Sequence, residues 1–257
     1  MKNRLPRRSA PRNDELKSNL ISLANKYEVA SFCDEDPSQF LRWYKKDTTN
    51  IELASFIAAM LAFGSRSQFI PKIRQILQTA DNSSGDISTW LKNDTYKKDF
   101  PTGTKKFYRF YSYDDMQIFF DELAEIIKNH KSLGNYFHEQ WKSDFHLADI
   151  ISQSFPKSRL VPKGKNSANK RIHMFLRWMV RQNSPVDLGL WTWYSAKDLL
   201  IPLDVHVMQE SQKLGLLPEN ATASRKTAIT LTNLMNQIFP DDPARMDFAL
   251  FGLGVNP

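Results

Sequence analysis

The chain has 257 residues, 41% of them hydrophobic and 25% charged, which is typical of an ordinary globular protein with one large domain or two small ones. One cysteine, Cys33, excludes an internal disulfide framework and any four-cysteine zinc or iron–sulfur site. No apolar run approaches the ~20 residues of a membrane span, the N-terminus lacks a signal-peptide core, and no glycine-rich nucleotide-binding motif is present.

The net charge of +7 is concentrated at the N-terminus. Residues 1–13, MKNRLPRRSAPRN, carry five basic residues and no acid, which leaves +2 for the rest of the chain. A segment rich in proline and arginine cannot bury a core, so residues 1–13 are expected to form a disordered basic tail. Such a tail either holds nucleic-acid phosphates without sequence preference or keeps the protein in solution.

Helical periodicity dominates the remaining chain, and no convincing run of alternating strands is found. Residues 50–63 are apolar nearly all round and predict a buried helix, while 68–80 and 113–130 have apolar residues at three- and four-residue spacing. Residues 187–202 are aromatic and predict an irregular segment. Residues 224–239 and 242–254 predict two more helices, the second opened by Pro243. The predicted fold class is all-α.

The segment NSANKRIHMFLRWMVRQ (166–182) predicts an amphipathic helix with Lys170, Arg177 and Arg181 together on one face. Ser167 or Asn169 is expected to cap it, which places Lys170 in the first turn. The positive end of the helix dipole disfavours an ammonium there and favours the neutral, nucleophilic amine, although an ordinary surface lysine fits the same pattern.

Residues 157–181 contain eight Lys or Arg residues and no Asp or Glu. A stretch whose charged residues are all positive suggests an anionic partner. The alternative is a solvated face whose charge is balanced by acids elsewhere.

The segment IPLDVHVMQESQKLG (201–215) predicts a helix from Val205 to Leu214. Asp204 stands at the N-cap position, where its carboxylate accepts a backbone N–H, and Gly215 marks the C-terminal stop. The sequence therefore predicts at least a helix-capping role for Asp204.

Together these segments resemble the helix-hairpin-helix DNA glycosylase superfamily. IPLDVHV is similar to the PVDVH stretch of 8-oxoguanine DNA glycosylases, and SANKRIHMFLRWMV is similar to the lysine-bearing helix that precedes it. The gap of 34 residues between Lys170 and Asp204 is similar to that of the archaeal type. ELASFIAAMLAFGSRSQFIPKIRQIL resembles the early buried helix of these enzymes and the turn that faces their DNA-binding cleft. The FALFGLG segment also resembles that of an uncharacterised bacterial family within the superfamily.

The resemblance implies two helical lobes flanking a cleft, built as a single domain of two interleaved lobes over residues 14–257. It implies that Lys170 attacks the sugar and that Asp204 assists it. In MDFALFGLG (246–254), Asp247 and Phe251 would contact the damaged base, because a carboxylate accepts from the N–H groups of a guanine-type edge and an aromatic ring stacks on the base.

The chain departs from the superfamily at the hairpin. In place of L-P-G-V-G stands LVPKGKNSANK (160–170), where Lys163, Gly164 and Lys165 are expected to contact DNA phosphates. Arg177 is a further expected DNA contact, and His206 would by resemblance reach a backbone phosphate. Trp191 and Trp193 either line the cleft or pack in the core. The iron–sulfur cysteines of the endonuclease III branch are absent, and no metal or other cofactor is expected.

The implied function is a base-excision DNA glycosylase with AP-lyase activity that removes an oxidised purine such as 8-oxoguanine. The expected partner is damaged duplex DNA and not a membrane. We expect a cytoplasmic, nucleoid-associated monomer. Two alternatives stay open: a non-catalytic nucleic-acid-binding protein on the same scaffold, and a helical interaction module with no nucleic-acid role.

Overall fold

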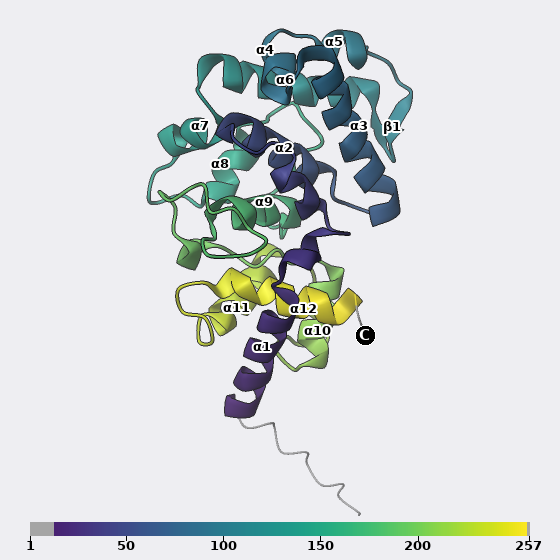
Figure 1. Ribbon diagram of the computed structural model, residues 1–257. Coiled ribbons are helices and arrows are strands. Elements are labelled where there is room, and N and C mark those ends of the chain that lie inside the picture. The colour runs from purple at the N-terminus through teal and green to yellow at the C-terminus, as the bar shows by residue number, and fades with distance from the viewer. Residues whose placement is uncertain (1–12, 256–257) are drawn as a thin grey trace, which may run out of the picture.

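The computed structural model of the protein describes residues 13–255 and is 60% helix and 3% strand (Figure 1). The all-α prediction is therefore confirmed at the level of fold class. The predicted basic tail lies outside the described residues except for Asn13, which is the first residue of helix α1. Within residues 13–255, no helix is long and apolar enough to cross a membrane.

The larger of two hydrophobic cores surrounds α2, the helix predicted to be buried (Figure 1). Residues Leu53–Leu61 of α2 are almost entirely inaccessible to solvent, so the helix has neighbours on every side. The elements around this core are η2 (Pro37–Arg42), α2 (Thr48–Leu61), α3 (Arg66–Ser84), α4 (Ile87–Lys92), α5 (Tyr96–Asp99), α6 (Tyr113–Asn129), α7 (Leu133–Gln140), α8 (Leu147–Gln153) and α9 (Lys170–Val180).

A second, smaller core joins the two ends of the chain. It is built from α1 (Asn13–Tyr27), α10 (Val205–Lys213), α11 (Arg225–Met235) and α12 (Met246–Val255). Helix α12 packs against both α1 and α10, below the larger lobe in Figure 1. Short 3-10 turns complete the fold: η1 (Ala30–Cys33), η3 (Ala196–Asp198) in the segment predicted to be irregular, and η4 (Pro243–Arg245). Pro243 therefore opens this turn, and α12 itself begins at Met246.

A short antiparallel hairpin, β1 (Lys106–Tyr108) and β2 (Tyr111–Ser112), is a difference from the prediction, which found no strands. Its strands are too short to show an alternating pattern. Tertiary contacts hold it instead: the Tyr108 hydroxyl donates to the Phe63 carbonyl, and the Tyr111 hydroxyl donates to the Arg159 carbonyl at 3.2 Å.

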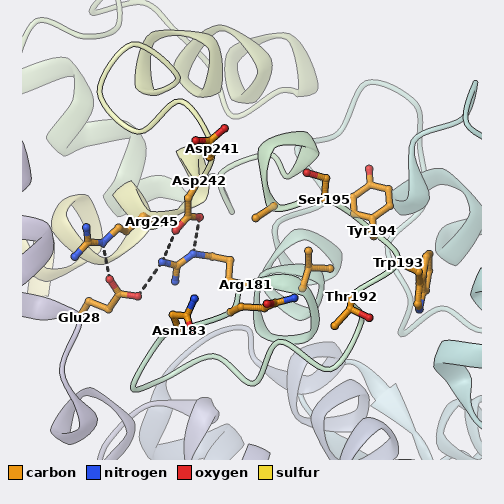
Figure 2. Close-up of a pocket in the computed structure, with 13 residues that line it drawn as sticks. Glu28, Arg181, Asn183, Thr192, Trp193, Tyr194, Ser195, Asp241, Asp242 and Arg245 are labelled. Atoms are coloured by element: carbon orange, nitrogen blue, oxygen red, sulfur yellow. Dashed lines mark hydrogen bonds and ion pairs between the residues drawn. The ribbon is translucent and has the colours of Figure 1, made fainter.

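A buried network of charges ties the two lobes together. Arg177 of α9 and Arg181, the residue that follows this helix, both pair with Asp187, whose side chain is 0% exposed. Arg177 also pairs with Asp247 of α12. Arg181 also pairs with Asp242 and Glu28 (Figure 2). Because each of these acids has an arginine partner, the burial of their charge is compensated.

We predict that Asp187→Asn lowers the free energy of unfolding by roughly 3–5 kcal/mol, because it leaves two buried guanidiniums short of one negative charge. Chemical denaturation of the wild-type and variant proteins measures the difference. Asp241→Asn is the matched control, since Asp241 is an exposed acid near the same network. Equal stabilities for the two variants would contradict a structural role for the network.

Candidate functional site

Lys170 is the first residue of α9, as its place in the first turn predicted. The preceding residue, Asn169, adopts a left-handed conformation with φ 43° and ψ 42°. The predicted side-chain cap is not made by any described residue: Asn169 gives none, and the Ser167 hydroxyl accepts from the Asn169 N–H at 3.3 Å instead. The sharp turn at Asn169 directs the chain into α9 with Lys170 at its tip.

Asp204 caps α10 as predicted, and the cap uses only one of its two oxygens. Asp204 Oδ1 accepts the Val207 N–H at 2.9 Å, and Gly215, with φ +72°, ends the helix. Asp204 Oδ2 lies 3.5 Å from Lys170 Nζ. The helix cap therefore fixes the carboxylate while its second oxygen faces the lysine. The two side chains are 27% and 20% exposed, so both can be reached from solvent.

The pair opens into a cavity of about 700 Å³, a size typical of sites for small organic groups. Its wall combines apolar and aromatic side chains with a few charged groups. The lining residues are Asp36, Pro37, Ala62, Phe63, Gly64, Arg66, Phe69, Pro162, Ser167, Asn169, Lys170, Arg171, Asp204, Val205, His206, Phe251 and Gly254. The turn after α2, which the resemblance implies faces the cleft, thus contributes Ala62, Phe63, Gly64 and Arg66 to this wall.

Phe251 supplies an aromatic wall, but its ring is not open to the cavity in this structure. The Arg66 guanidinium lies 5.0 Å from the centre of the Phe251 ring, and Arg66 also pairs with the buried Asp36 at 3.6 Å. Phe32 packs edge-on against the same ring at 5.9 Å. A planar ligand that stacks on Phe251 from the Arg66 side must displace the guanidinium.

Asp247 lies one turn before Phe251 on α12, and it is buried rather than in the cavity wall. Its Oδ2 pairs with Arg177, and no described residue makes a hydrogen bond to its Oδ1. The side chain keeps 9% of its surface exposed. Burial raises the pKa of Asp247 to about 6, while the charges of Arg177 and Lys170 oppose the rise.

Arg177 does not lie where the basic segment predicted. Its side chain is 3% exposed and pairs with Asp187 and Asp247, so it has no access to a DNA phosphate. The prediction that Arg177 contacts DNA is therefore wrong, because its side chain belongs to the charge network between the lobes. Arg181, which was predicted to share a helix face with Lys170 and Arg177, is likewise buried.

Lys163, Gly164 and Lys165, the residues expected at the hairpin of the glycosylase resemblance, are exposed and have different contacts. The Lys163 ammonium donates to the carbonyls of Ser152 and Phe155 at the end of α8, and the partial burial of this ammonium lowers the pKa of Lys163. Gly164 is exposed and has φ +109°, and Lys165 is exposed beside it. Among these residues, only Lys165 extends freely to solvent. His206 is exposed on the first turn of α10 and lines the cavity.

Asp36, Phe63, Arg66 and Arg171 are among the cavity residues that were not predicted individually. The Asp-Pro pair at 36–37 is a helix-start signal that would have marked Asp36, which accepts the Ser38 N–H at 3.0 Å. Arg171 donates to the Met60 carbonyl at the end of α2, and its guanidinium lies 4.9 Å from the Phe63 ring centre. No pattern in the sequence predicts contact between residues as far apart as Met60 and Arg171.

A second cavity, of about 720 Å³, lies beside the buried charge network (Figure 2). Trp193 lines it, whereas Trp191 is buried and donates from Nε1 to Glu52 at 2.7 Å. Its two arginines, Arg181 and Arg245, are both paired with acids, and the described residues of its wall include no lysine. The amine and carboxylate suited to covalent chemistry therefore occur in the first cavity.

Comparison with known proteins gives one match. A family model described as "Protein of unknown function (DUF2400)" matches residues 36–256, which include every residue of the Lys170 cavity. No curated protein and no solved structure matches the chain.

His173, one turn after Lys170, gives a prediction for the pH dependence of stability. Burial, aided by Arg225 and His146 and opposed by Asp149, lowers the pKa of His173 to about 4. The unfolded chain takes up this proton near pH 6.5 and the folded chain does not, so stability is lost as the pH falls from about 6.5 to about 4. At about 1.4 kcal/mol per pKa unit, the loss reaches ~3 kcal/mol.

Denaturation of the wild type and His173→Phe at several pH values tests this. The variant is expected to lose less stability over this range, since both proteins share all other titrating groups. Parallel stability curves would contradict the assignment.

Proposed function

The chain belongs to the DUF2400 family, and we propose that it is a DNA glycosylase with AP-lyase activity that excises an oxidised purine. The observation that carries the proposal is the placement of Lys170 Nζ 3.5 Å from Asp204 Oδ2, at the wall of a cavity of about 700 Å³. An amine beside a fixed carboxylate is the pair that Schiff-base chemistry requires.

Asp204 is suited to take the proton from Lys170. Its Oδ1 is held by the Val207 N–H, so Oδ2 keeps its position when the proton moves. Removal of the proton leaves a neutral amine with a free electron pair. The carboxylate is also placed to stabilise positive charge that develops on the sugar of a bound nucleotide.

The proposed reaction proceeds on a nucleotide extruded from the duplex. The Lys170 amine forms a bond to C1′, and the glycosidic bond breaks, with its electron pair and a proton leaving on the base. The C1′–O4′ bond then opens to give a Schiff base. Loss of a proton from C2′ and departure of the 3′-phosphate cleave the strand by β-elimination.

Phe251 in the cavity wall and the buried Asp247, one turn before it on α12, support a purine as the excised base. Phe251 offers an aromatic face once Arg66 moves aside, and Asp247 keeps one carboxylate oxygen that no described residue hydrogen-bonds. A carboxylate accepts from the N1–H and N2–H₂ groups of a guanine-type edge. These groups favour 8-oxoguanine over an oxidised pyrimidine.

The arrangement of the lobes also agrees with the resemblance to helix-hairpin-helix DNA glycosylases. Lys170 comes from the larger lobe, whereas Asp204, His206 and Phe251 come from the smaller one, so the cavity lies between the lobes. Lys165 and His206 are exposed near it and suit contacts with the phosphates on either side of the nucleotide.

We predict that borohydride traps the wild-type chain covalently on a duplex with an abasic site, because hydride reduces the Schiff base at C1′. Lys170→Gln is expected to lose trapping completely. Lys98→Gln, at an exposed lysine of α5 that does not line the cavity, is the matched control and should trap as the wild type does. Salt-dependent DNA binding without trapping would instead favour the non-catalytic alternative.

Asp204→Asn tests the second residue of the pair in the same assay. The amide can still accept the Val207 N–H but cannot take the proton, so DNA affinity should persist while base release falls strongly. Full activity of this variant would remove Asp204 from the mechanism.

Phe251→Leu separates base recognition from chemistry. Loss of the aromatic face should slow the release of 8-oxoguanine roughly 5- to 150-fold, equivalent to about 1–3 kcal/mol of stacking, and leave cleavage at a preformed abasic site unchanged. Single-turnover kinetics on the two duplexes measures both steps. An equal loss on both substrates would indicate a structural rather than a recognition role for Phe251.

A further inference from the structure

In the cavity of about 700 Å³, arginine side chains of the wall cover two of its aromatic rings. The Arg66 guanidinium lies 5.0 Å from the centre of the Phe251 ring. The Arg171 guanidinium lies 4.9 Å from the centre of the Phe63 ring, and that of Arg109, from the β1–β2 turn, lies 5.7 Å from the same ring. The aromatic faces that would attract a cationic ligand are thus already occupied by cations of the protein itself.

Arg66 is held at its ring by a buried carboxylate. Its Nη2 lies 3.6 Å from Asp36 Oδ2. Asp36 is itself fixed, because its Oδ1 accepts the Ser38 N–H at 3.0 Å and its side chain is only 10% exposed. Departure of Arg66 into solvent would leave this buried carboxylate without the cation that it pairs with, which is unfavourable. The guanidinium can therefore shift beside Asp36, but it stays in the cavity.

A base that stacks on Phe251 from the cavity meets Arg66. Phe32, which packs edge-on against the Phe251 ring at 5.9 Å, does not line the cavity, whereas Arg66 does. The base therefore lies between the Phe251 ring and the shifted guanidinium. A guanidinium is planar and stacks on aromatic faces, so Arg66 is suited to cover the second face of the base.

We propose that the cavity accepts electrically neutral, electron-rich purines and rejects bases that carry a positive charge, and that Arg66 separates the two classes. A guanidinium on the face of the base is attracted to an electron-rich ring and repels a cationic one. Oxidised purines such as 8-oxoguanine belong to the first class, and purines alkylated at N7, which are cationic in DNA, belong to the second. This inference rests on the proposed function, because it takes the cavity as the seat of the extruded base.

The other charges of the cavity wall act in the same direction. Its described lining has more basic residues than acids: Arg66, Lys170 and Arg171 against Asp36 and Asp204. A positively charged base is therefore disfavoured by the lining as a whole, and most strongly by the cation that lies on its face.

The test compares the affinities of the protein for two duplexes that differ in one base, 8-oxoguanine in the first and 7-methylguanine in the second. Both carry a 2′-fluoro sugar at that position, so that neither base is released during the measurement. The wild type is expected to bind the 8-oxoguanine duplex roughly 10- to 100-fold more tightly, because two like charges a few ångströms apart repel near a protein surface. Arg66→Gln should remove most of this preference.

Two further variants separate charge from stacking and from general effects. Arg66→Lys keeps the positive charge without the planar group. It should still reject the 7-methylguanine duplex and bind the 8-oxoguanine duplex roughly 2- to 5-fold more weakly than the wild type. Arg74→Gln is the matched control, since Arg74 also belongs to α3 and lies 5.7 Å from the Trp43 ring but does not line the cavity. Its preference should equal that of the wild type.

The outcomes separate this inference from the proposed function. An unchanged preference in Arg66→Gln, with borohydride trapping of the same variant on an abasic duplex, would overturn the role of Arg66 and leave the chemistry intact. Equal binding of the two duplexes by the wild type would overturn the charge selection, and failure of the wild type to trap would overturn the proposed function as well. Loss of the preference in Arg66→Gln and its retention in Arg66→Lys would support the inference without any dependence on catalysis.

Discussion

The pairing of Arg177 with Asp247 is the contact on which the geometry of the site depends. Arg177 belongs to α9, two turns after Lys170, and Asp247 belongs to α12, which packs on the helix capped by Asp204. This buried ion pair therefore joins the helix that begins at Lys170 to the lobe that carries Asp204. Asp187 completes the charge balance on the α9 side. Because a half-broken buried pair is costly, the lobes are held in one relative position.

The geometry of Asp204 lets the capping role seen in the structure and the chemical role that we propose share one side chain. A carboxylate has two oxygens, and the N-cap needs only one of them. The backbone N–H of Val207 fixes the torsion of the carboxylate, so the free oxygen lies 3.5 Å from Lys170 without further support from a side chain. The proposed role of this cap in proton transfer costs the fold nothing extra, since the helix start requires an acceptor there in any case.

The sequence was most informative where a signal is local. Helical periodicity predicted the main helices, and the Pro202–Asp204 pattern predicted the cap and the start of α10. The prediction that Arg177 contacts DNA failed, because a run of positive charges does not reveal compensating acids elsewhere in the chain. The acidic partners of Arg177 lie 10 and 70 residues away. The β1–β2 hairpin was not predicted for a related reason: tertiary contacts hold its two strands, which are too short to show an alternating hydrophobic pattern.

The positive charge at the mouth of the Lys170 cavity is consequently a property of the fold and not of one basic segment. Arg66 follows α2, Arg109 comes from the hairpin turn, and Arg171 and Lys170 begin α9, so distant stretches of chain bring cations to one opening. The lining of this cavity has three basic residues, Arg66, Lys170 and Arg171, against two acids, Asp36 and Asp204, whereas the lining of the second has two arginines against three acids (Figure 2). An anionic ligand, such as the DNA that we propose, is therefore favoured at the cavity that holds the amine.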